Sequence, residues 1–162
     1  DHELLFEGVR HTLSIDPGPS GEFYLTDAFQ YMVDQGSGLI TAPVEGWWDA
    51  GKPETLLETN EHLLKIGHGG IDEGASIEGA EIIEPVRIEA GVTVRGGKIG
   101  PNVTLEAGAT VTDSELEHTV VGASSELTRV RLQYSLIGGN SSLSDVSGRL
   151  LVTDHSVVTG AS

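Results

Sequence analysis

From residue 77 onward, branched apolar residues recur at steps of five or six. A helical face would repeat them at three and four residues, and a half-buried strand at two. A step near six indicates short strands joined by turns, each strand directing one aliphatic side chain to a common axis. The pattern therefore predicts a mainly β stack of coils. The expected inward positions are Ile77, Ile82, Ile88, Val94, Ile99, Leu105, Val111, Leu116, Val121, Leu127, Leu132, Ile137 and Leu143.

The same region contains internal copies of one motif. "LEHTVVGASSEL" at 116–127 aligns without a gap with "LQYSLIGGNSSL" at 132–143, and further copies occupy 94–105 and 77–88. Glycine and asparagine between the apolar positions permit the positive φ of tight corners. We expect each aliphatic residue to lie over its counterpart in the next coil, which gives one continuous apolar column.

Residues 1–66 follow a helical period instead. In "FYLTDAFQYMVDQG", Thr26 is expected to cap a helix that Gly36 ends, with Phe29, Met32 and Val33 facing inward. In "GKPETLLETNEHLLKIG", Pro53 is expected to open a second helix that Gly67 closes. Its inward face is predicted to hold Leu56, Leu57, Asn60, Leu63 and Leu64.

Between these helices, "GLITAPV" at 38–44 predicts one short strand. A lone strand cannot form a sheet, so we expect residues 1–66 to be the end of a larger α/β domain whose sheet lies upstream. The alternative is a small helical cap folded onto the repeats. The predicted organisation is thus 1–66, a linker at 67–76, and a solenoid at 77–162.

The charge is strongly acidic, with 25 Asp and Glu against 9 Lys and Arg and a net charge of −16. No basic stripe exists to bind phosphate, which argues against nucleic acid and anionic membranes as partners. Scattered acidic residues are typical of proteins that stay soluble in high salt, so we expect a halophilic source. The absence of cysteine excludes disulfides. Without a long apolar run or a signal-peptide pattern, a cytoplasmic protein is expected.

The segments "GEFYLTDAFQYMVDQG" and "VEGWWDAGKPETLLETNEHLL" resemble the end of the catalytic domain of long-type glucose-1-phosphate thymidylyltransferases, which are sugar-1-phosphate nucleotidyltransferases. The likeness lies in "GE…TDA", "GWW…DxGKPE" and the "LLxxN" helix. The repeats after them resemble hexapeptide repeats. The resemblance implies a left-handed parallel β-helix preceded by the C-terminal α/β fragment of a Rossmann-like nucleotidyltransferase domain. The hand of the coils comes from the resemblance alone.

In that family the phosphate of a sugar 1-phosphate attacks the α-phosphorus of a nucleoside triphosphate, yielding a nucleotide sugar such as dTDP-glucose. Carboxylates hold the Mg²⁺ that this chemistry uses. Asp49 matches the metal-binding aspartate; the alternative is a turn aspartate that bonds its own backbone. Glu22 and Lys52 are candidate substrate contacts, with helix-start roles as the alternative. Two departures from the family pattern bear on these residues: Ser20 replaces an arginine, and one residue is missing between Trp48 and Asp49.

The family's glycine-rich nucleotide-binding loop, its first metal-binding aspartate and its sugar-phosphate lysine do not occur in this sequence. We therefore expect the chain alone to be inactive and to serve assembly, as a fragment of a longer enzyme or one half of a split enzyme, with homo-oligomers forming through the β-helix.

The competing hypothesis is acetyl-CoA-dependent acyl transfer to a sugar phosphate, with His118 or His155 as general base. The alternative for each histidine is an ordinary surface residue. No basic cluster in the sequence lies beside either one to bind the CoA phosphates. A γ-class carbonic anhydrase would need three histidines on adjoining coils, and two distant ones do not meet that count.

Overall fold

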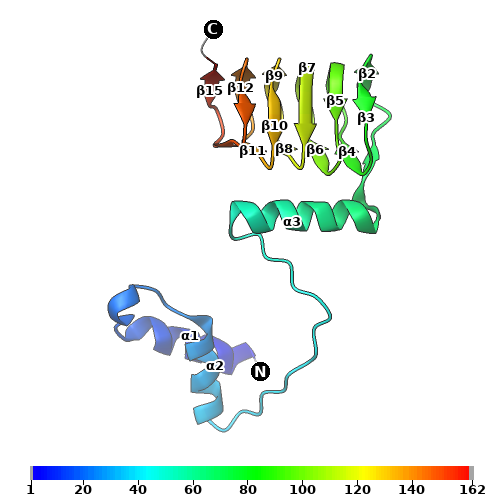
Figure 1. Cartoon of the computed structure of the whole chain (residues 1–162). Coiled ribbons are helices and arrows are strands. Elements are labelled where there is room, and N and C mark those ends of the chain that lie inside the picture. Colours follow the sequence, from blue (N-terminus) through cyan, green and yellow to red (C-terminus); the bar gives the residue numbers. More distant parts are fainter. Residues whose placement is uncertain (1, 161–162) are drawn as a thin grey trace. The chain divides into compact units, whose positions relative to one another are not determined.

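The computed structural model describes residues 2–160 and divides into two compact units, residues 1–46 and 47–162. The first unit is helical. The second contains one helix followed by a stack of short strands (Figure 1). Each unit is described by itself.

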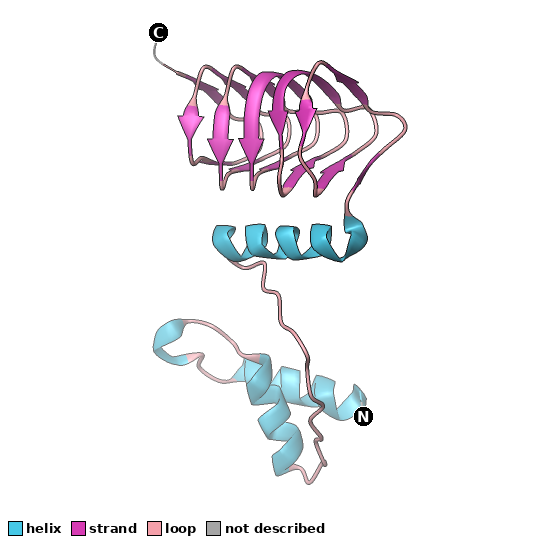
Figure 2. Ribbon diagram, turned by 45° about the vertical axis from the view of Figure 1, so that its right-hand side comes forward, coloured by secondary structure: helices cyan, strands magenta, loops and turns pink. Residues whose placement is uncertain are grey.

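The strands of the second unit form a parallel β-helix with three faces (Figure 2). The first face holds β1 (Gly70–Ile71), β4 (Val86–Ile88), β6 (Val103–Leu105), β8 (Val120–Val121), β11 (Leu136–Ile137) and β14 (Leu151–Val152). The second holds β2 (Ser76–Glu78), the starts of β5 (Thr93–Ile99) and β7 (Thr110–Glu117), β9 (Glu126–Thr128), β12 (Ser142–Ser144) and β15 (Val157–Thr159). The third holds β3 (Glu81–Ile82), the ends of β5 and β7, β10 (Arg131–Gln133) and β13 (Ser147–Gly148). The mainly β solenoid predicted from the apolar spacing is confirmed.

The register confirms the repeat alignment for the later copies. Leu116 pairs with Leu132, and Val121 with Ile137. The copies at 77–88 and 94–105 begin one face earlier in the coil, because Val94 pairs with Val111 rather than with Leu116. All predicted inward residues from Ile88 to Leu143 are buried, and Ile77 and Ile82 in the first coil are half-buried. Stacked coils thus bury one continuous apolar column.

Buried hydroxyl groups tie neighbouring coils together. The amide of Ser141 donates to Oγ of Ser125 at 3.1 Å, and that hydroxyl donates to the carbonyl of Gly138 at 2.9 Å. The amide of Leu150 donates to Oγ of Ser135 at 2.9 Å. A buried polar group without a partner is costly, so these serines are compatible with an apolar interior only because each is hydrogen-bonded.

The corners use more than glycine and asparagine. Nine non-glycine residues of the described chain have positive φ: Asn102, Asp113, His118, Ser124, Arg129, Tyr134, Asn140, Asp145 and His155. Asn102, His118 and Tyr134 follow one another at a single corner, since the amide of His118 donates to Pro101 and that of Tyr134 to Glu117. We call these three residues the corner column. Sequence reasoning expected small residues here and missed these larger side chains.

The helix α3 (Pro53–Leu63) and the π-helical turn η2 (Leu64–His68) belong to the same unit as the solenoid. Pro53 opens α3, as predicted. Leu57 and Leu64 are buried, whereas Leu63 is exposed. The boundary between the units lies before α3, whereas the sequence suggested 66/67, and β1 begins inside the expected linker. The difference arises because α3 packs on the coils.

The first unit contains α1 (His2–Ser14), a short 3₁₀ turn η1 (Gly18–Ser20) and α2 (Leu25–Asp34). The predicted end of α2 is confirmed: Gly36 has φ of 85°, and its amide donates to the carbonyl of Val33 at 2.8 Å. The predicted cap is wrong, because Tyr24 precedes the first turn and no side chain caps it. Thr26 therefore lies inside α2.

The inward face of α2 also differs from the prediction. Ala28 and Met32 are buried, whereas Phe29 and Val33 are exposed. Residues 38–44 form no strand, and the described residues of the first unit, to which they belong, contain no strand. Across residues 2–160, no helix has both the length and the apolar character needed to cross a bilayer.

Candidate functional site

Asp49 lies in an exposed turn immediately before α3. Its Oδ1 accepts a hydrogen bond from the amide of Gly51 at 3.1 Å. Its carbonyl accepts one from the Thr59 hydroxyl of α3, also at 3.1 Å. The turn-aspartate geometry weighed from the sequence is therefore present in this exposed residue.

Lys52 and Glu22 occupy helix-start and loop positions. The amide of Lys52 donates to the Thr55 hydroxyl at 3.3 Å, which organises the first turn of α3. The Lys52 side chain is exposed, as is Glu22. Glu22 accepts a hydrogen bond from the Tyr24 hydroxyl at 3.1 Å. Glu22 belongs to the first unit and Lys52 to the second, and for both residues the substrate contact stays a prediction.

The turn of Asp49 is attached to α3 through an aromatic contact. Trp48 stacks on His62 with ring centroids 3.8 Å apart and an interplanar angle of 17°. Trp47 is 84% exposed. Trp47, Trp48 and Asp49 line a shallow hollow together with Thr55, Glu58 and Thr59 of α3. This hollow is the candidate site of the described chain.

The carboxylate of Asp49 suits Mg²⁺, which prefers oxygen ligands and is commonly held by one or two carboxylates plus substrate phosphates. Within residues 2–160 no group of three or more acidic or histidine side chains is arranged to hold a metal. One carboxylate does not fill the coordination shell of Mg²⁺, so the metal role of Asp49 stays a prediction.

His118 is less accessible than its sequence position suggested. Its side chain is only 18% exposed. Its ring stacks on Tyr134 with centroids 4.6 Å apart, and Nδ1 lies 3.3 Å from Nδ2 of Asn102. Nδ1 also lies 3.4 Å from a carboxylate oxygen of Glu61 in α3. His155, in contrast, is exposed at a corner of the last coil.

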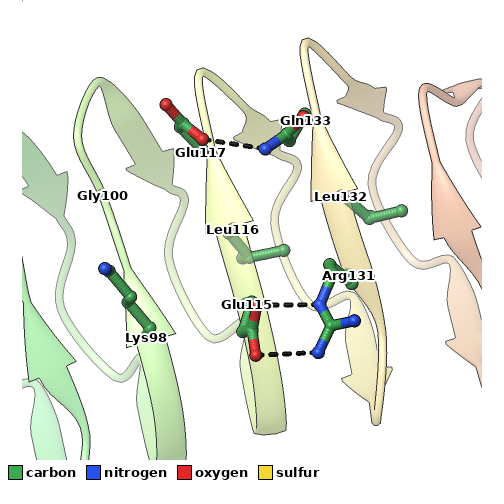
Figure 3. Close-up of a pocket in the computed structure, with 8 residues that line it drawn as sticks. All are labelled: Lys98, Gly100, Glu115, Leu116, Glu117, Arg131, Leu132 and Gln133. Atoms are coloured by element: carbon green, nitrogen blue, oxygen red, sulfur yellow. Dashed lines mark hydrogen bonds and ion pairs between the residues drawn. The ribbon is translucent and has the colours of Figure 1, made fainter.

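The third face carries a small hollow between β5, β7 and β10 (Figure 3). Arg131 binds Glu115 through two hydrogen bonds of 2.8 and 3.0 Å, and Gln133 donates to Glu117 at 2.9 Å. The hydrogen bonds from Arg131 hold the pKa of Glu115 below its usual value, while desolvation opposes them. The guanidinium is thus already neutralised, which disfavours this hollow as an anion site.

No family model matches the chain. It is 30% identical to glucose-1-phosphate thymidylyltransferase of Streptomyces antibioticus, over 95% of this chain and 49% of that protein. It is 41% identical to the low-salt glycan biosynthesis nucleotidyltransferase Agl11 of Haloferax volcanii, over 85% of this chain and 39% of that protein.

The chain is homologous to sugar nucleotidyltransferases. A shorter match, 37% identical over 44% of this chain, is to the bifunctional protein GlmU of Methanococcus aeolicus. This nucleotidyltransferase homologue spans about half the length of the first relatives. The resemblance recognised in the "GE…TDA" and "GWW…DxGKPE" segments is confirmed.

Sequence reasoning missed the polar contacts between α3 and the corner column. Asn60 was assigned to the inward face of α3 among leucines, which was a usable signal, because a polar residue on a buried face needs a polar partner. In the structure, Oδ1 of Asn60 accepts a hydrogen bond from the Thr104 hydroxyl at 2.6 Å. The partners of Asn60 are more than forty residues away, beyond what a local pattern reveals.

Proposed function

We propose that this chain is the C-terminal part of a nucleotidyltransferase that makes a nucleotide sugar, of the dTDP-glucose type, from a nucleoside triphosphate and a sugar 1-phosphate. The observation that carries the proposal is the similarity to thymidylyltransferase across nearly the whole chain, at half the length of that relative. The exposed apolar surface of the first unit supports it, because a missing α/β sheet would cover such a surface.

In the proposed reaction, a phosphate oxygen of the sugar 1-phosphate forms a bond to the α-phosphorus, and the bond to the β-phosphate oxygen breaks, releasing pyrophosphate. Bound Mg²⁺ would supply charge neutralisation for these phosphates. The contribution of this chain is the carboxylate of Asp49. The amide of Gly51 donates to this carboxylate and the Thr59 hydroxyl donates to the backbone carbonyl of Asp49, and together these bonds fix the turn at the hollow that Trp47 and Trp48 also line.

The solenoid is proposed to serve assembly in such an enzyme. Its core is closed by its own coils, so an end or a flat face is available to a second copy, and closed symmetry would give a homo-oligomer. The net charge of −16 requires screening when copies meet. We therefore also propose a high-salt environment, in which copies of this acidic chain associate.

Acyl transfer gains no support from the histidines. His118 lies between Tyr134, Asn102 and Glu61, which leaves little room for it to reach a substrate. His155 is free of that enclosure, but no side-chain hydrogen bond or ion pair orients it among the described contacts. We retain the nucleotidyl function as the better-supported one.

The test compares this chain with a longer protein that includes the upstream sequence. Incubated with dTTP, glucose 1-phosphate and Mg²⁺, the chain alone is expected to release no pyrophosphate and the longer protein to release it. In the longer protein Asp49→Asn is expected to remove most of the activity, with Asp154→Asn in the last coil as the matched control. Pyrophosphate release by the chain alone, or full activity of Asp49→Asn, would contradict the proposal.

A further inference from the structure

The helix α3 lies along the stacking direction of the coils (Figures 1 and 2). Three helical residues rise by about 4.5 Å, close to the ~4.8 Å between strands of neighbouring coils. Residues on one side of α3 therefore lie against successive coils. The turn η2, which begins at Leu64, contacts β4. Asn60 bonds Thr104 of β6, one coil further along. The helix thus contacts more than one coil of the solenoid.

The polar contacts fix which residue of α3 meets which coil. Oδ1 of Asn60 accepts a hydrogen bond from the Thr104 hydroxyl at 2.6 Å, and Nδ2 of the same side chain donates to the backbone carbonyl of Asn102 at 3.4 Å. Glu61 approaches His118 at 3.4 Å. At the start of α3, Glu54 pairs with Arg149, which precedes β14. Apolar contacts alone would tolerate sliding along the solenoid, whereas directional polar contacts do not.

The far side of α3 holds the candidate site. The Thr59 hydroxyl donates to the carbonyl of Asp49, and His62 stacks on Trp48. Thr59 and His62 are immediate neighbours of the docking residues Asn60 and Glu61. A continuous series of contacts therefore runs from the corner column, through one turn of α3, to the turn of Asp49.

We propose that the corner column is the docking site for α3 and that His118 is a positioning residue, which sets the location of Asp49 without touching substrate. The catalytic consequence rests on the proposed function, but the docking itself does not. His118 is suited to the role because it joins both sides: its ring packs on Tyr134 and approaches Asn102 within the solenoid, and it faces Glu61 on the helix.

Removing the His118 side chain also affects Asn102. This residue is 5% exposed, and its Oδ1 already has no hydrogen-bond partner among the described residues. Without the imidazole, its Nδ2 would lose the ring nitrogen 3.3 Å away. Leaving a buried donor unpaired is unfavourable, so the corner is expected to rearrange and loosen its hold on α3.

The experiment compares His118→Gly with His155→Gly in this chain. Both histidines have positive φ, 44° and 58°, which glycine adopts freely, so backbone strain is removed equally in the two variants. In His118→Gly, amide hydrogen exchange in α3 is expected to accelerate about tenfold relative to the parent, with exchange in β9 and β12 unchanged. In His155→Gly, α3 is expected to exchange at the parent rate.

Tryptophan fluorescence supplies a second readout, since both tryptophans of the chain lie in the turn before α3. Emission is expected to change in His118→Gly and not in His155→Gly, because Trp48 loses its fixed stacking on His62. If His118→Gly does not fold, Thr104→Val replaces it, since this variant removes the bond to Asn60 at nearly constant volume. Unchanged exchange in α3 in the folded variant would overturn the docking role.

The catalytic consequence is tested separately in the longer protein. There His118→Gly is expected to lower kcat by about tenfold while the KM for sugar phosphate changes little, because Asp49 moves and substrate contacts do not. Loosened α3 with unchanged kcat would retain docking and reject the positioning of Asp49. Loss of acyl-transfer turnover in His118→Gly, with α3 still protected, would instead identify His118 as a general base.

Discussion

Leu132 in the solenoid and Ile40 in the helical unit are both large aliphatic residues, yet the first is fully buried and the second is 98% exposed. The contrast extends across both units. The apolar column of the solenoid is covered by its own neighbouring coils. The first unit leaves many large apolar residues exposed, including Phe6, Leu13, Ile15, Phe23, Tyr24, Leu25, Val33, Leu39 and Val44.

The difference follows from architecture. In a solenoid each coil contacts only its neighbours, so a segment of the array is already a complete core. Helices of an α/β domain bury one face against a sheet, and they cannot supply that sheet themselves. The helices α1 and α2 pack closely at Gly8, where a Cβ would lie 2.7 Å from the Ala28 carbonyl oxygen, yet their other faces stay exposed. Few side chains can pack in so narrow a crossing.

The largest expected effect is the loss of unfolding free energy when a buried side chain of the solenoid is truncated. Leu132→Ala removes a fully buried side chain, so we expect the unfolding free energy of the solenoid to fall by about 2–5 kcal/mol. Val33→Ala in α2 is the matched control, because Val33 is 45% exposed, and we expect a change within about 0.5 kcal/mol. Urea titration followed by circular dichroism measures both. Equal effects would contradict the contrast between the units.

The sequence predicted the solenoid well because its signal is local and repeated. Each coil supplies its own apolar residues at fixed spacing, so Leu116, Val121 and Leu127 could be assigned without knowledge of the rest of the fold. The error in phase at 94–105 arose because all three faces repeat a similar short apolar step. Val94 pairs with Val111, which lies one face and five residues before Leu116, the start of the next assigned copy.

Prediction was poorer where stability depends on distant partners. The strand at 38–44 needs a neighbouring strand, and the described residues of the first unit contain none. Thr26 has the chemistry of a cap, but α2 begins at Leu25, one residue before it. The environment of His118 depends on α3 crossing the corner column, which no spacing along the chain encodes. Asp49 was located, but its role as a metal ligand stays a prediction.

A smaller effect concerns the ion pairs between coils. Hydrogen bonds from Arg131 lower the pKa of Glu115, and those from Arg129 lower the pKa of Asp145. Because the folded pKa lies below the unfolded one, the fold favours the charged carboxylates. Their stabilisation is complete above the ordinary values of 4.5 and 3.8 and is lost as the pH falls through the lowered folded values.

We therefore expect the melting temperature of the solenoid to decline between about pH 5 and pH 2. The paired variant Glu115→Gln, Asp145→Asn should start from a slightly lower value at pH 7 and decline less steeply. The difference is expected to be smaller than that of Leu132→Ala, since both pairs are exposed and screened by salt. Parallel melting curves for parent and variant would show that these pairs add nothing.

The smallest expected effect in this chain is that of Ile40→Ser. The side chain is 98% exposed and removes almost no surface from water on folding, so we expect the unfolding free energy to change by no more than about 0.5 kcal/mol. The same substitution should behave differently in a longer nucleotidyltransferase, if an upstream sheet covers residues 38–44. There the serine hydroxyl would be buried, and we expect a loss of about 1–3 kcal/mol.

The comparison of the two proteins, each titrated with urea, makes Ile40 a test of what covers the first unit. Gln35→Ala, five residues earlier and exposed, is the control, with no effect expected in either protein. An equal and negligible effect of Ile40→Ser in both would mean that no sheet reaches this segment. The exposed apolar residues would then require another explanation, and the alternative of a small independent helical cap would be favoured over an incomplete α/β domain.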